Sequence, residues 1–176
     1  RKTDIPWCTP ETASESGYWC NKERTALLVT EEDLTWVPTQ HPDALVALST
    51  SSRSVLADTS AIVHQFVSAS ICDAVERISD RPELQSAVLA DQPLGDDALV
   101  HWLTEQKIDE VLCAYVPIGP TRLRLDTLKG TLACKGISLR LQMRDYDRVV
   151  WPHTSKGFFQ LGKKIPDLLS MMNLAN

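Results

Sequence analysis

The stretch Glu110-Val-Leu-Cys-Ala-Tyr-Val116, followed at once by Pro117-Ile-Gly-Pro120, decides the fold class. The first run is almost entirely apolar, which is typical of a strand buried on both faces of a parallel sheet. Pro120 suits the first turn of a following helix, and Gly136 suits the residue that ends it. The stretch therefore predicts a central strand that leads into a helix with an inward stripe of Leu125, Leu128 and Leu132.

Apolar patterns elsewhere in the chain predict the other strands. Thr25–Thr30 and Ala44–Ser49 are short apolar runs, and each predicts a further strand buried on both faces. Ser138–Arg144 alternates between polar and apolar side chains, which indicates an edge strand with one face in solvent. Glu83–Leu89 alternates weakly and predicts a short strand.

Helical spacing separates these strands. Asp58 is a suitable N-cap for a helix, and residues 95–107 predict a second helix with Asp96 and Asp97 at the positive end of its dipole. The apolar residues predicted to face the core from the first helix are Ile62, Val63, Phe66, Val67, Ile71, Ala74, Val75 and Ile78. Strands that alternate with helices indicate the α/β class, with a doubly wound, mostly parallel sheet.

The composition excludes several classes of protein. The chain has 176 residues, of which 43% are hydrophobic, and this suffices for one core. No apolar run approaches the roughly 20 residues that cross a bilayer. The net charge of -5 repels phosphate backbones, so the chain alone is not expected to bind DNA nonspecifically. We expect a soluble, cytoplasmic protein that makes no membrane contact.

Cysteine usage points away from disulfides and metal. The chain has five cysteines, an odd number, and Cys72, Cys113 and Cys134 lie in apolar segments where they are predicted to be reduced core residues. Cys8 and Cys20 lie in a polar segment without the paired spacing of a zinc site. No metal is predicted, and the role of these two cysteines stays open.

The N-terminal residues differ in character from the rest. Residues 1–23 contain Pro6, Pro10 and Gly17 among many polar residues without periodicity, which predicts a linker or a loosely docked arm. The α/β domain is predicted to span residues 24–176. A linker at the start would also agree with a domain taken from a larger protein.

Loops at the carboxyl ends of the strands are the places to look for a ligand. Gly119, Thr121, Arg122 and Arg124 surround a predicted helix start, where backbone N–H groups attract anions. Neither a Walker loop nor a dinucleotide glycine pattern is present, so an ordinary turn with exposed arginines is the favoured interpretation. The run Glu31, Glu32, Asp33 fits a solvated loop better than a divalent-cation site. No nucleophile–base pair supports a hydrolase.

The C-terminal part combines aromatic and basic side chains. Residues 151–166 include Trp151, Lys156, Phe158 and Phe159, and then Lys163 and Lys164. Such a combination can stack on and neutralise a nucleotide. The favoured interpretation is structural, because aromatic side chains chiefly contribute buried area when a segment packs on the sheet or on a neighbouring domain.

The order of these features resembles the α/β lobe of DNA photolyases and cryptochromes. Thr30-Glu-Glu-Asp-Leu34 stands where photolyases carry Arg-Arg-Asp-Leu, and Asp33 and Leu34 match. The other matching segments are the helix His64–Arg77, the segment Glu83–Leu89 before a helix at Asp96, the strand at Val111, Arg122-Leu-Arg-Leu-Asp126 and Gly136-Ile137. Trp151-Pro-His-Thr-Ser-Lys-Gly-Phe-Phe159 with Lys164-Ile-Pro166 is similar to a bacterial group in which this lobe follows the FAD-binding domain.

The resemblance implies a Rossmann-like sheet of five strands in the order 3-2-1-4-5. It implies that FAD, the chemistry and the contact with DNA belong to a helical domain of the parent flavoprotein, which would be a deoxyribodipyrimidine photo-lyase or a signalling relative. It also implies a lobe that in photolyases can shelter an antenna chromophore against the FAD domain. This chain would then be non-catalytic by itself and would hold no cofactor. The alternative is a stand-alone nucleotide-binding module that uses residues 119–124 and the C-terminal lysines.

Overall fold

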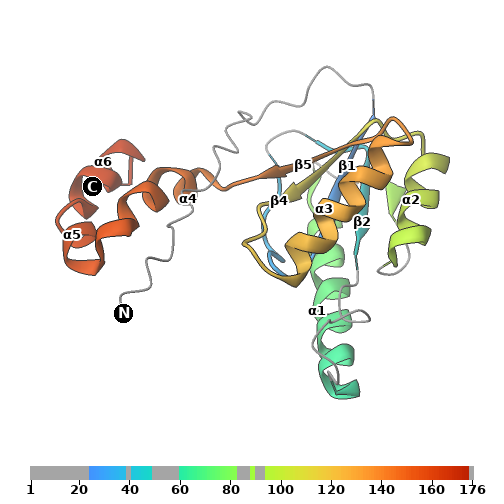
Figure 1. The fold of residues 1–176 in the computed structure, drawn as a ribbon, viewed down its shortest axis with the longest axis horizontal. Coiled ribbons are helices and arrows are strands. Elements are labelled where there is room, and N and C mark those ends of the chain that lie inside the picture. The colour runs from blue at the N-terminus through green and yellow to red at the C-terminus, as the bar shows by residue number, and fades with distance from the viewer. Residues whose placement is uncertain (1–23, 39–40, 49–59, 83–87, 90–93, 175–176) are drawn as a thin grey trace, which may run out of the picture. The chain divides into compact units, whose positions relative to one another are not determined.

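The fold is built around a parallel β-sheet (Figure 1). The computed structural model describes residues 24–38, 41–48, 60–82, 88–89 and 94–174. Four parallel strands, in the order β2-β1-β4-β5, are β2 (Ala44–Ala47), β1 (Thr25–Val29), β4 (Glu110–Ala114) and β5 (Ser138–Gln142). A two-residue segment, β3 (Val88–Leu89), pairs in parallel with β2. The predicted parallel α/β class is confirmed.

Alternating side chains of β1 enter two separate apolar layers. Ala26 and Leu28 pack into the layer on one face of the sheet, while Leu27 and Val29 pack into the layer on the other face. Successive side chains of a strand point to opposite faces, so a strand with helices on both sides must be apolar at every position. This requirement explains the uninterrupted apolar runs of the central strands.

Helices cover both faces of the sheet. One layer is formed with α1 (Ala61–Ser79), which contributes buried Ile71, Ala74 and Ile78. The opposite layer is formed with α2 (Asp96–Glu105) and α3 (Pro120–Ala133). Both predicted ends of α3 are confirmed. Pro120 occupies its first turn, and Gly136 follows the helix with a positive φ of 77°.

The predicted core face of α1 is wrong over its first two turns. Ile62, Val63 and Phe66 are exposed, with Phe66 72% accessible. The N-terminal end of α1 extends beyond the edge of the sheet in Figure 1, and these exposed residues belong to that end of the helix. Helix α1 begins after Ser60, and the predicted N-cap Asp58 lies outside the described residues.

Two of the three predicted core cysteines are also not in the core. Cys113 on β4 is fully buried, whereas Cys72 and Cys134 are exposed free thiols. Cys72 lies on α1 next to buried Ile71, and consecutive helical residues point in different directions. An apolar segment therefore did not specify the side of the helix on which each cysteine lies.

Carboxylates fix the amino ends of the strands. The Asp43 carboxylate accepts hydrogen bonds from the Thr25 backbone N–H (2.7 Å) and hydroxyl (3.2 Å). Glu110, only 1% exposed, pairs with Arg140 of β5 at 3.1 Å. A buried carboxylate is costly unless it is paired, so this ion pair ties the edge strand to its neighbour.

The residues from Met143 onward belong to a second compact unit, separate from the unit that ends at Gln142. Its described part consists of α4 (Asp145–Val150), the 3-10 helix η3 (Trp151–Lys156), α5 (Phe158–Gly162) and α6 (Ile165–Met171). The sequence patterns did not predict these helices, because each spans at most seven residues, whereas helical periodicity is recognised over a window of about 11–18 residues.

Two further sequence predictions concern the N-terminal residues and membrane-spanning segments. The predicted linker at residues 1–23 lies outside the described residues. In the described ranges, no helix combines the length and the apolar character that a membrane span requires.

Leu28 tests the doubly covered sheet, because its side chain is 1% exposed and its strand lies between β2 and β4. We expect Leu28→Ala to lower the free energy of unfolding in urea by about 3 kcal/mol through lost burial and an unfilled cavity. The control is Leu123→Ala, where the leucine is 68% exposed and the expected change is below about 0.5 kcal/mol. Equal losses in the two variants would contradict this packing.

Candidate strand-edge site

The candidate site lies at the carboxyl edge of the sheet. Because β1 and β4 run in parallel, the segment after Val29 and the segment after Ala114 leave the sheet at the same edge. The first carries Glu31, Glu32 and Asp33, and the second leads through Gly119 into α3. Parallel α/β sheets bind ligands at this edge.

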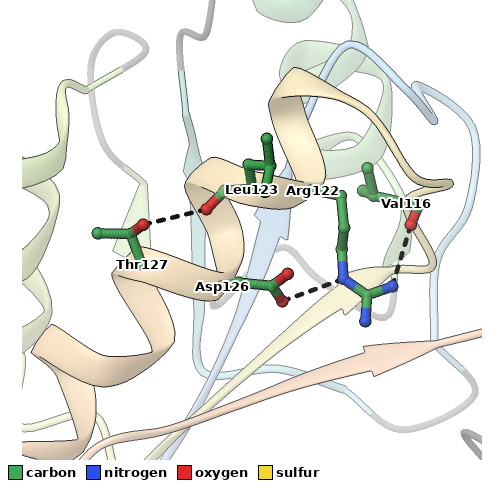
Figure 2. A network of polar contacts seen from close by, with 5 residues as sticks. All are labelled: Val116, Arg122, Leu123, Asp126 and Thr127. Atoms are coloured by element: carbon green, nitrogen blue, oxygen red, sulfur yellow. Dashed lines mark hydrogen bonds and ion pairs between the residues drawn. The ribbon is translucent and has the colours of Figure 1, made fainter.

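Arg122 is held by groups of its own segment (Figure 2). Its Nε donates to Asp126 Oδ1 at 3.1 Å, and its Nη1 donates to the Val116 carbonyl oxygen at 3.3 Å. The guanidinium carbon also lies 5.7 Å from the centre of the Tyr115 ring, within range of a cation–π interaction. The guanidinium therefore closes the loop between β4 and α3 onto the helix.

The surroundings of Arg122 favour its charged form. Burial alone would lower the pKa of Arg122, but the hydrogen bond and charge of Asp126, together with Tyr115, outweigh burial and raise the pKa. A cation that is already neutralised by a carboxylate attracts an external phosphate less strongly. Arg122 thus has a well-defined structural role in the loop.

Arg124 connects two helices. Its Nε donates to Asp96 Oδ1 at 2.7 Å, and the two side chains are only 11% and 27% exposed. Asp96 is the first residue of α2, where a carboxylate is also favoured by the helix dipole. This ion pair joins the start of α2 to the first turns of α3.

The other two predicted residues of this loop have ordinary backbone and packing roles. Thr121 is 6% exposed, so its side chain faces the core. Gly119 has an extended backbone with φ of 170°, and a Cβ there would meet only the Pro117 carbonyl oxygen at 4.0 Å. Nothing in the fold requires glycine at this position. The Leu123 N–H already donates to the Gly119 carbonyl oxygen at 3.0 Å, which starts the helix.

The three acidic residues after β1 have different surroundings. Asp33 Oδ1 accepts hydrogen bonds from the backbone N–H groups of Thr35 and Trp36, both at 3.0 Å, and so forms the turn. Glu32 is exposed, whereas Glu31 is half-buried. Among the described residues, no group of three or more acidic, histidine or cysteine side chains is arranged to hold a metal ion.

Burial perturbs two groups near this edge. The pKa of Glu31 is raised above its ordinary value of 4.5, chiefly by burial and further by the charge of Glu32, while its own backbone N–H and Arg124 oppose the rise. Within the described part of the chain, the buried Glu31 Oε2 has no hydrogen-bond partner. Complete burial raises the pKa of Cys113 to about 12, so this thiol stays protonated at neutral pH.

The predicted aromatic–lysine residues belong to the second unit. Trp151 is half-buried, and the side chain of Lys156 lies outside the described part. Phe158 and Phe159 are 75% and 84% exposed and meet edge to face, with ring centres 5.8 Å apart. Packing of these aromatic side chains on the sheet or on a neighbouring domain therefore stays a prediction.

The partners of both arginines were not predicted from the sequence. Asp126 could have been predicted as the partner of Arg122, because a residue four positions later lies on the same helix face. Asp96 could not have been predicted, because its contact with Arg124 joins residues 28 positions apart. Tyr115 was assigned only to the apolar run of β4.

Comparisons with protein-family models, with curated proteins and with solved structures found no match for this chain.

Glu31 supplies a test of the electrostatics at this edge. A raised pKa means that ionised Glu31 opposes folding, so we expect Glu31→Gln to raise the urea midpoint at pH 7. The advantage should shrink as the pH falls toward about 4, where the wild-type carboxyl becomes protonated in both states. Glu32→Gln, at the exposed neighbouring position, removes only the charge that adds to the rise and should give a smaller gain. A gain that is independent of pH would contradict the assigned cause.

Proposed function

We propose that this chain is the α/β domain of a photolyase- or cryptochrome-related flavoprotein and is non-catalytic by itself. The observation that carries the proposal is the order of motifs from His64 to Pro166, set in a parallel α/β framework. In this proposal the parent acts in the cytoplasm. It binds FAD through a helical domain. In some members the α/β lobe shelters an antenna chromophore against that domain. That domain performs light-driven repair of DNA or signalling, and it is the partner of this chain.

We extend the proposal to the details of the sheet. In it, β3 is the fifth strand of a Rossmann-like sheet, in the order 3-2-1-4-5. Support comes from the parallel pairing of Val88 with Ala44 and of Leu89 with Leu45, on the side of β2 away from β1. The neighbouring residues 83–87 and 90–93 lie outside the described ranges.

The contacts at the strand edge support a non-catalytic role. Arg122 and Arg124 each pair with a carboxylate of the same chain, and Thr121 is buried. These arginines stabilise the loop and the helix pair, so less of their charge is available to attract a substrate than if they were unpaired. The alternative, a stand-alone nucleotide-binding module, is favoured by one feature only: α3 begins at the carboxyl edge of a parallel sheet.

The flavoprotein proposal predicts that the purified chain lacks a chromophore and activity of its own. We expect no flavin absorbance near 450 nm after purification or after incubation with FAD, and no light-dependent repair of cyclobutane dimers. The same measurements on the polypeptide encoded by the complete gene should give bound flavin. Stoichiometric flavin on the isolated chain, or the lack of a flavin-binding domain in the complete polypeptide, would refute the proposal.

A thermal-shift screen with mono-, di- and trinucleotides tests the alternative. We expect no substantial rise in Tm for the wild-type chain. If a rise occurs and is lost in Arg122→Ala and Arg124→Ala, the nucleotide module is favoured. Because Arg124→Ala also breaks the contact with Asp96, Asp96→Asn is the matched control: it breaks the same ion pair and retains the arginine. Each variant is compared with its own Tm without nucleotide.

A further inference from the structure

The second unit exposes apolar and basic side chains that are close together in the sequence. We call this set the Phe–Lys surface, and it consists of Phe158, Phe159, Lys163 and Lys164. Phe158 and Phe159 are among the most exposed large apolar residues of the described chain, at 75% and 84%. An exposed aromatic pair is unfavourable in water and commonly marks an interaction surface.

The backbone groups these side chains. Gly157 has a positive φ of 81°, a conformation that favours glycine, and α5 starts directly after it with the two phenylalanines. Lys163 caps α5 and lies four positions after Phe159, so both lie on one side of the helix. Lys164 follows, and its Nζ lies 3.1 Å from His153 Nδ1.

The charge on this surface is uncompensated. Neither Lys163 nor Lys164 forms an ion pair with a carboxylate among the described residues. The only formal charges in residues 151–166 come from lysines, although the whole chain has a net charge of -5. The surface is therefore a basic, aromatic area on an acidic chain.

This charge argues against several occupants. A symmetric pairing of two copies would bring the same lysines together, and like charges oppose such an interface. A polyanion such as nucleic acid or an anionic membrane is large enough to approach the whole chain, whose net charge of -5 opposes it, whereas a carboxylate rim would be confined to the Phe–Lys surface. The two rings also lie at 70° to each other, so they do not form one flat platform for consecutive bases.

We propose that the Phe–Lys surface is a docking site for a protein partner that presents an amphipathic helix whose apolar face is bordered by carboxylates. Phe158 and Phe159 would pack on the apolar face, and Lys163 and Lys164 would meet the carboxylates at its rim. Aromatic side chains at the centre of an interface with charges at its rim are the usual arrangement of a specific protein contact. The proposal does not depend on the flavoprotein assignment.

The experiment uses the full 176-residue chain and a defined probe. The probe is a fluorescent amphipathic helical peptide with leucines on one face and glutamates flanking them, and binding is measured by anisotropy. We expect saturable binding that weakens at least about tenfold in the double variant Phe158→Ala, Phe159→Ala. Gln160→Ala, an exposed neutral position on the same helix, is the matched control and should bind like the wild type.

Reversal of charge gives the sharper readout. In the double variant Lys163→Glu, Lys164→Glu, preference should switch from the glutamate peptide to a matched lysine peptide. Circular dichroism verifies that every variant is folded, which the exposure of the substituted side chains leads us to expect.

Four outcomes would overturn the proposal. These are no binding of the acidic peptide, unchanged binding in the phenylalanine variant, tighter binding of phosphatidylserine vesicles or oligo(dT) than of the peptide, and a concentration-dependent dimer that the phenylalanine variant abolishes. Each outcome replaces the acidic protein partner with another occupant or with none.

Discussion

β1 and β4 pair at the centre of the sheet and are buried on both faces, and the rest of the α/β unit depends on this constraint. Leu28 of β1 stands beside Val46 and Cys113, and all three side chains are at most 1% exposed. A strand covered on both sides needs helices on both sides, which fixes α1 against one face and α2 with α3 against the other. The parallel pairing also brings the segments after β1 and β4 to one edge.

Ion pairs connect the helices and strands that this core holds. Glu110 with Arg140 links β4 to β5, and Arg124 with Asp96 links α3 to α2. Each pair is substantially buried, so the loss of one partner would leave a charge without compensation in a poorly solvated place. The basic residues at the strand edge thus belong first to the architecture, and this is why that edge offers little free charge to a ligand.

The second unit follows a different plan. Leu168 is a buried side chain of its short helices, whereas Phe158, Phe159 and Met171 are mostly exposed. A unit of this kind gains little from its own core, and covering its exposed aromatic side chains would add apolar burial. Its exposed aromatic side chains therefore agree with the proposed role in a larger interface.

Periodicity in the sequence determined the class of fold, the central strands and the end of α3 shortly before Gly136, because these depend on local burial patterns and backbone preferences. Tertiary structure alone decided where the sheet ends, which leaves Phe66 in solvent although its spacing predicts a core position. It also decided that Arg124 meets Asp96, a contact between residues 28 positions apart. The spacing of apolar residues along a chain indicates which side of a helix is apolar. It does not indicate how far the neighbouring element extends or which distant charged residue lies beside the helix.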